Sequence, residues 1–261
     1  MESGHAIRRH SRFAASSSER IMNCPGSVKL SEGMPDKTSP AALEGTKCHE
    51  VVERIVTGRP YRDLNPSFEM VPHARQAATY VLAAHARAAK GSDLLVESKV
   101  SLAFIHPEAF GTLDYAIIEH FGVLNIMDFK YGTHLVSAIK NLQLIFYALG
   151  VAHANHWAFS HVRLTIIQPR ASGYDGPSFW ELTIEQLKSF IPRFKAAYER
   201  AEKFPNQYKE GYHCFFCKGR VKCPLKTEGR MGSLIKNFEM ASTIQKGNLK
   251  WLNSKQAKSK E

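Results

Sequence analysis

The segment 111–130 contains two acidic residues and a lysine whose spacing could form a metal-dependent hydrolytic site. Two runs rich in apolar and β-branched residues, 111–119 and 123–130, predict an antiparallel hairpin that turns at Phe121-Gly122. Opposed residues in such a hairpin have numbers with a constant sum, so a turn centred near 121 places Asp114 opposite Asp128. Lys130 lies two residues beyond Asp128 and therefore on the same face of its strand.

Opposed carboxylates destabilise a hairpin unless a positive charge neutralises them, because their Cβ atoms lie only about 4.5–5.5 Å apart. Mg²⁺ or Mn²⁺, which prefer carboxylate and water oxygens, would neutralise Asp114 and Asp128. The Lys130 ammonium could stabilise developing negative charge or position a water molecule. From these residues alone, the alternative is a solvated strand end where Asp128 and Lys130 form an ion pair. Glu97 could add a carboxylate or orient a metal-bound water, or it could be an exposed strand residue.

The elements that would position these residues follow from the periodicity of the apolar side chains. Strands are predicted at 94–102, 111–119 and 123–130, all antiparallel, and a fourth at 162–168. Helices are predicted to begin near Glu19, with Ser16-Ser17-Ser18 as caps, and to span 41–57, 72–90, 134–155 and 183–203. The pattern indicates an α+β domain over residues 16–224, with a flexible arm at 1–15 and a basic tail at 225–261.

Four of the five cysteines could form one metal centre. Cys214, Cys217 and Cys223 have the spacing C-x2-C-x5-C, and three thiolates need a fourth ligand. Cys24, which also precedes a proline and follows a short predicted helix, is the natural partner, and iron-sulfur chemistry suits four thiolates. Structural zinc is the alternative, held by four cysteines or by three cysteines and His213. Cys48 is expected to be a small buried residue instead of a ligand.

Taken together, Gly-Thr-Leu-Asp, then Asp-x-Lys, then a helix with Gln143-x-x-x-Tyr147 resembles the RecB-type branch of the PD-(D/E)XK nucleases. The preceding helix has Glu44-Gly45-Thr46-Lys47-Cys48-His49-Glu50, which matches the family pattern at its metal-binding histidine. The resemblance covers roughly residues 16–224. This part of the chain is similar to CRISPR-associated RecB-like exonucleases, helicase-linked nuclease domains and phage proteins of that lineage. The family usually has glutamate at the position of Asp128, where aspartate is an accepted variant.

The resemblance implies a restriction-endonuclease-like core, with a central mixed sheet of about four or five strands flanked by helices. It implies that His49, Asp114 and Asp128 hold Mg²⁺ or Mn²⁺, with the carbonyl of Phe129 as a further ligand and Lys130 as the catalytic lysine. Gln143 and Tyr147 would contact DNA or brace the active site. The four cysteines Cys24, Cys214, Cys217 and Cys223 would hold a [4Fe–4S] cluster that fastens the two ends of the domain together.

Charge and composition agree with a DNA-binding enzyme. The net charge of +11 favours a polyanionic partner, although an anionic membrane would attract the same residues. No apolar stretch reaches the length of a membrane span and no secretion signal is evident, so a cytoplasmic protein is expected. The resemblance predicts a DNA exonuclease, 5′ to 3′, in phage or bacterial recombination, with a helicase or a single-strand annealing protein as partner and with oligomers allowed. A structure-specific endonuclease and a non-catalytic DNA-binding adaptor are the alternatives.

Overall fold

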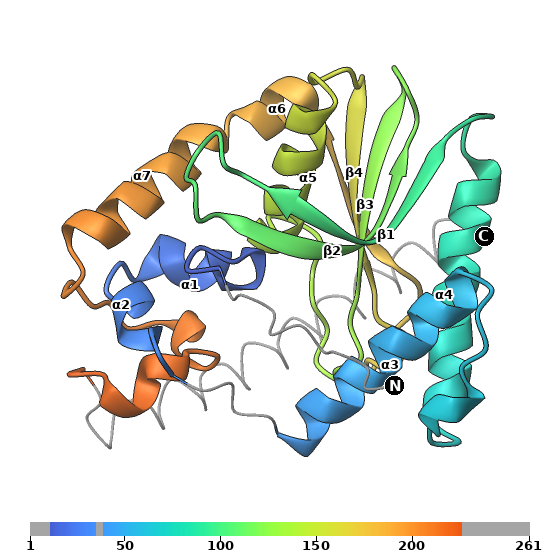
Figure 1. The fold of residues 1–261 in the computed structure, drawn as a ribbon, viewed down its shortest axis with the longest axis horizontal. Helices are drawn as coiled ribbons and strands as arrows, with labels where there is room; N and C mark the ends of the chain where they lie inside the picture. The colour runs from blue at the N-terminus through green and yellow to red at the C-terminus, as the bar shows by residue number, and fades with distance from the viewer. Residues whose placement is uncertain (1–10, 35–38, 226–261) are drawn as a thin grey trace, which may run out of the picture.

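The computed structural model describes residues 11–34 and 39–225, which form a five-stranded mixed sheet with helices on both faces (Figure 1). In chain order the elements are η1 (Ala15–Ser17), α1 (Ser18–Asn23), α2 (Ser27–Ser31), α3 (Pro40–Val56), η2 (Arg62–Leu64), α4 (Met70–Arg87), β1 (Asp93–Ser101), β2 (Phe110–Ile118), β3 (Val123–Phe129), α5 (Leu142–Ala154), β4 (His161–Ile167), β5 (Ser178–Thr183), α6 (Ile184–Lys188), α7 (Ile191–Lys203), η3 (Tyr212–Cys214) and η4 (Lys218–Lys222). Among the described residues, no helix is both long and apolar enough to cross a membrane.

The strands follow one another across the sheet in the order β1-β2-β3-β4-β5. β1, β2 and β3 are antiparallel, as predicted, and β5 is antiparallel to β4. β4 runs parallel to β3 because α5 connects them and returns the chain to the same end of the sheet. The predicted hairpin register is confirmed by four pairs, from Tyr115↔Met127 to Ile118↔Leu124.

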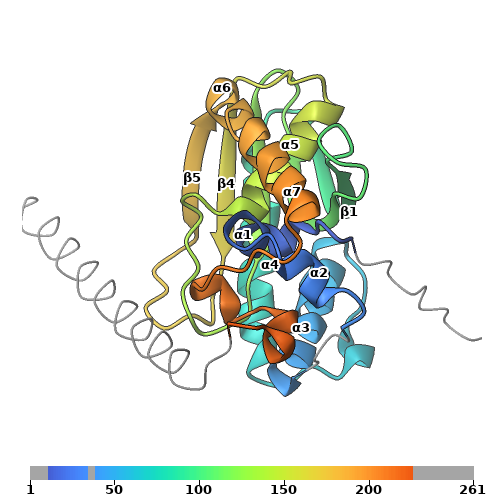
Figure 2. The same cartoon turned by 90° about the vertical axis from the view of Figure 1, so that its left-hand side faces the viewer.

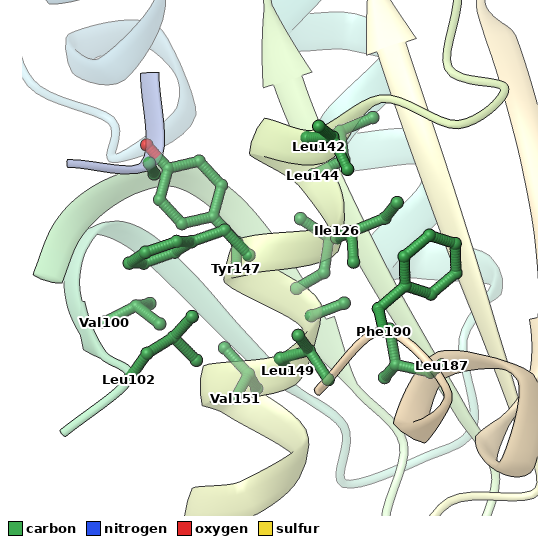
Figure 3. Close-up of a cluster of buried hydrophobic side chains, with 14 of the residues drawn as sticks. Val100, Leu102, Ile126, Leu142, Leu144, Tyr147, Leu149, Val151, Leu187 and Phe190 are labelled. Atoms are coloured by element: carbon green, nitrogen blue, oxygen red, sulfur yellow. The ribbon is translucent and has the colours of Figure 1, made fainter. Parts of the chain in front are cut away.

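Two apolar layers cover the two faces of the sheet. α5 is apolar around its whole circumference, and its side chains pack with Ile126 of β3 and with Leu187 and Phe190 (Figure 3). On the opposite face, α3 and α4 cover a second cluster that includes Tyr115 and Met127. Ile126 and Met127 are neighbours in β3 and face opposite layers. Because both faces of the sheet are covered, the short strands are almost continuously apolar.

Several predicted boundaries are wrong. The predicted helix at 134–155 begins only at Leu142, because the buried side chain of Gln168 binds the preceding loop through Val136 N, Gly132 O and His134 O. The predicted helix at 183–203 is two helices, α6 and α7, and Pro192 lies in the first turn of the second. Sequence analysis missed β5, whose six residues form an edge strand.

The N-terminal predictions also need correction. Residues 1–10 of the predicted arm, like residues 226–261 of the predicted tail, lie outside the described residues. Phe13 and Ala15 are buried in the core, so the packed part of the chain begins before residue 16. α1 begins at Ser18 near the predicted place, but no side chain caps it at Ser17.

Candidate metal site and its surroundings

Three side chains from three different elements converge beside the middle of strands β1 and β2. Ligand atoms of His49 in α3, Glu97 in β1 and Asp114 in β2 all lie within 4.8 Å of one another. His49 Nδ1 is 3.6 Å from Asp114 Oδ2. One imidazole and two carboxylates form a donor set that suits a divalent cation. Of the four predicted metal ligands, His49 and Asp114 are in this group, whereas Asp128 and the carbonyl of Phe129 are not, and Glu97 completes it.

Glu97 is held in an unusual backbone conformation. Its φ of 42° lies in the left-handed region, which an L-residue with a side chain rarely adopts. The pairs Val96↔Tyr115 and Ser98↔Leu113 keep one register on both sides, so Glu97 lies opposite Asp114. Strain of about 1–3 kcal/mol at such a residue is typical of functional sites. The only sequence signal for Glu97 was a charged residue that interrupts an apolar strand.

Asp114 lies where the ladder between β2 and β3 ends. The last ladder pair is Tyr115↔Met127, and beyond it the Phe129 N–H donates to Asp114 Oδ2 over 2.8 Å. Asp114 and Asp128 are not a ladder pair, but the two carboxylates are close enough for each charge to act on the other. Burial raises the pKa of Asp114 well above its usual range, and the nearby Asp128 carboxylate raises it further. A cation would restore the charged form.

Asp128 and Lys130 form a close ion pair beside this group. Lys130 Nζ lies 2.7 Å from Asp128 Oδ2, and the Asp128 side chain is only 2% exposed. Within the described part of the chain, Asp128 Oδ1 has no hydrogen-bond partner, whereas Oδ2 contacts the Lys130 ammonium. Burial opposes the charge of Lys130, but the carboxylates of Asp128 and Asp114 overcome this and hold its pKa above the ordinary value. A buried carboxylate oxygen such as Asp128 Oδ1 is available as a further ligand for a divalent cation.

Lys130 is held from its other side by α5. Its Nζ donates to Gln143 Oε1 over 3.1 Å, and Gln143 Nε2 donates to the Tyr147 hydroxyl over 3.4 Å. Asn141 caps this helix by accepting hydrogen bonds from the N–H groups of Gln143 and Leu144, so the position of Gln143 is fixed. Tyr147 is buried at 4% exposure, so in this conformation the predicted DNA-contacting pair braces the lysine.

His49 has the protonation state of a metal ligand. Burial is the main cause that lowers its pKa to about 4, and the ammonium of Lys130 contributes in the same direction. Asp128 and a hydrogen bond with the Phe129 main chain oppose the shift without cancelling it. The ring of Phe129 packs against the imidazole at 4.9 Å, edge to face. Near neutral pH the imidazole is uncharged, which is the form that binds metal ions.

Arg170 is a structural residue of the site that sequence analysis missed. Its guanidinium forms ion pairs with Glu44 in α3, at 2.9 Å, and with Glu69 before α4, at 3.2 Å. It also lies 4.5 Å above the ring of Tyr131, the residue after the predicted catalytic lysine. Arg170 therefore ties the helix that carries His49 to the end of β3. No sequence pattern could reveal contacts between segments so far apart in the chain.

The two ends of the described chain pack together in the region of the predicted cysteine cluster (Figure 2). α1 contacts η3, and α2 contacts η4. Gly26 N donates to Gln207 O over 2.8 Å, and a Cβ at Gly26 would lie 2.6 Å from the ring of Tyr208. A glycine is needed at position 26 because the two segments approach so closely.

Cys24, Cys214, Cys217 and Cys223 meet at this junction as free thiols. Burial raises the pKa of Cys214, and the other three cysteines are near enough to raise it further. No three of their sulfur atoms lie within 4.8 Å of one another, so a metal cluster is not demonstrated in the described residues. His213 Nε2 donates a hydrogen bond to the Lys209 carbonyl over 2.9 Å, which leaves Nδ1 as the atom through which this alternative ligand would bind a metal.

Cys48 lies apart from that junction. It is fully buried in the second apolar cluster, between α3 and α4 and the sheet, as expected for a small core residue.

Comparisons with known proteins give a family and two distant structures. Residues 10–259 match the model of a family described as "Protein of unknown function (DUF2800)". The crystal structure of SSO0001 aligns with 13% identity and a TM-score of 0.42, over 85% of this chain and 90% of that chain. An alkaline exonuclease (LHK-Exo) from Laribacter hongkongensis aligns with 12% identity and a TM-score of 0.27, over 74% of this chain and 95% of that one.

Proposed function

The chain belongs to the DUF2800 family, and we propose that it is a divalent-metal-dependent nuclease that hydrolyses DNA phosphodiester bonds. The observation that carries the proposal is the convergence of His49, Glu97 and Asp114 beside the buried ion pair of Asp128 and Lys130. Such a concentration of carboxylates repels a phosphodiester unless a cation is present. A structural ion pair alone would not need an imidazole and two further carboxylates at the same place.

We propose that His49, Glu97 and Asp114 hold the cation, with Asp128 as a further ligand through one of its oxygens. A bound Mg²⁺ or Mn²⁺ would neutralise phosphate charge and lower the pKa of a water molecule. The residues of the chain have separate tasks. Lys130 stays protonated and presents an ammonium for the negative charge that develops on the phosphate. Gln143 holds that ammonium in position by accepting one of its hydrogen bonds.

DNA is the proposed substrate because the net charge of +11 suits a polyanion and the site suits a phosphodiester. An exonuclease acting from 5′ to 3′ in recombination or DNA processing, aided by a helicase or annealing protein, follows from the family resemblance of the sequence. A structure-specific endonuclease is the alternative within the same chemistry. A DNA-binding adaptor is disfavoured, because a binding surface has no use for clustered carboxylates that face its anionic ligand.

The proposal is tested by cleavage of linear and circular DNA in EDTA, Mg²⁺ and Mn²⁺. We expect degradation of linear DNA that requires a divalent cation and is abolished in Asp114→Asn. Cleavage of closed circles would favour the endonuclease. Tight DNA binding with no cleavage in any metal would favour the adaptor. Glu50→Gln is a matched control, because Glu50 is also on α3 but pairs with Arg54 at 2.8 Å, outside the site.

We further propose that Cys24, Cys214, Cys217 and Cys223 bind a [4Fe–4S] cluster. Support comes from the packing of the two chain ends that carry these cysteines, and from the nearness of Cys24, Cys217 and Cys223 to Cys214. The cluster would join thiolates that are far apart in the sequence. Because such a site does not exist in the unfolded chain, the free energy of cluster binding would stabilise the folded protein. Protein purified without oxygen should be brown and contain about four irons per chain. A colourless protein with one tightly bound zinc would overturn the cluster and leave the nuclease proposal standing.

A further inference from the structure

A pocket of about 490 Å³ lies between α1, the beginning of α5 and α7, and none of its lining residues belongs to the candidate metal site. The three helices are adjacent in both overall views (Figures 1 and 2), and α1 contacts both of the others. Its wall contains three basic side chains, Lys140, Arg193 and Arg200, and one acidic side chain, Glu19. Three cations against one carboxylate leave a net charge of +2.

The positive charge of the pocket is not consumed by ion pairs. Within residues 11–34 and 39–225, no carboxylate pairs with any of the three cations. Arg200 donates one hydrogen bond to the Met22 carbonyl over 3.1 Å, and Arg193 lies 5.0 Å from the centre of the Phe190 ring. These contacts orient the two guanidinium groups and leave their charge for an anion. The carboxylate of Glu19 already accepts a hydrogen bond from Asn23 over 3.0 Å.

The first turn of α5 joins this pocket to the metal site. Leu142 lines the pocket, while the next residue, Gln143, accepts the hydrogen bond from Lys130. Lys140 precedes the capping residue of the helix and has a φ of 58°, a left-handed conformation that is unfavourable for lysine. The pocket and the proposed catalytic lysine therefore lie on either side of one helical turn.

We propose that this pocket binds a backbone phosphate of the same DNA strand that is cleaved at the metal site. The inference rests on the proposed nuclease function and adds a second phosphate-binding position to it. Guanidinium groups match phosphate oxygens with paired hydrogen bonds, and an ammonium supplies a compact charge. The beginning of α5 contacts Lys130 through Gln143 and also lines the pocket, so a strand bound at Lys130 would have these cations within its reach. In the described structure no carboxylate pairs with them.

The test measures DNA binding without cleavage. A fluorescent duplex with single-stranded ends is titrated in EDTA at several salt concentrations, with the wild type, Lys140→Ala and Arg193→Ala. Each lost phosphate contact should reduce the slope of log K against log salt by about 0.7 to 0.9, together with a severalfold loss of affinity at low salt. Lys195→Ala is the matched control, because Lys195 is exposed on the same helix but does not line the pocket.

An unchanged slope in Lys140→Ala and Arg193→Ala, or an equal fall in Lys195→Ala, would overturn the inference. So would a wild-type protein that does not bind DNA. Thermal melting of each variant separates loss of binding from loss of folding, and Lys140→Ala breaks no hydrogen bond or ion pair of the described structure. Cleavage in Mn²⁺ is measured in parallel. Cleavage by the wild type, with salt slopes unchanged in the two pocket variants, would reject phosphate binding by the pocket and keep the nuclease proposal. Altered salt slopes in those variants, with no cleavage by the wild type, would keep phosphate binding by the pocket and reject the nuclease proposal.

Discussion

Removal of the Lys130 ammonium should destabilise the protein as well as stop cleavage, because it leaves the Asp128 carboxylate buried without compensation. The two groups are 2.7 Å apart, and only 2% of the Asp128 side chain is exposed. Loss of one partner of a buried ion pair lowers the free energy of unfolding by about 3–5 kcal/mol. We expect the lower value, about 3 kcal/mol, because 29% of the Lys130 side chain is exposed and water can enter its place.

The assay is urea and thermal denaturation in EDTA of Lys130→Met, Asp128→Asn and the double variant. A loss of about 3 kcal/mol corresponds to a fall in Tm of roughly 6–12 °C for a chain of this size. The double variant should recover most of this loss, because the neutral amide no longer requires a cation. Cleavage by Lys130→Met should fall by about 100-fold or more, since its charge would no longer stabilise the phosphate.

The double-mutant cycle measures the coupling energy between Asp128 and Lys130. Neighbouring groups of one network show such a coupling energy, whereas distant groups do not. Equal unfolding free energies of Lys130→Met and the double variant would refute the claim that Asp128 depends on the lysine. Wild-type stability of Lys130→Met would also refute it. Wild-type cleavage by a well-folded Lys130→Met would remove Lys130 from the proposed chemistry.

Three further predictions follow from the site and its supports. His49→Ala should lose most activity and regain part of it at high Mn²⁺, and an unchanged metal requirement in cleavage assays would argue against ligation by His49. Cys24→Ser should lose metal and thermal stability as severely as loss of a late cysteine, whereas Cys48→Ser should bind metal normally; full iron content in Cys24→Ser would make His213 the better ligand. Arg170→Ala should weaken metal affinity about tenfold through loosening of α3, with kcat at saturating Mn²⁺ nearly unchanged; unaltered metal titration would show that Arg170 has no positioning role.

The sequence by itself determined the local parts of the molecule. The symmetry of one short hairpin was sufficient to give its register, because opposed residues are fixed by the turn and by which face is apolar. The spacing of the three late cysteines predicts a shared centre, because their separation in the chain is short, and this centre stays a prediction. The ends of the elements were less accurate. Helix α5 begins later than its periodicity predicts because a buried Gln168 holds the loop before it.

The tertiary structure alone decided which residues form the site. His49, Glu97 and Asp114 come from three elements, and their convergence depends on how α3 packs against β1 and β2. The same packing makes Glu97 a member of the metal group. The ion pairs of Arg170 and the basic pocket beside α5 also join distant segments. Periodicity and spacing describe neighbours along the chain, whereas these contacts arise only when burial of apolar surface brings separate elements together.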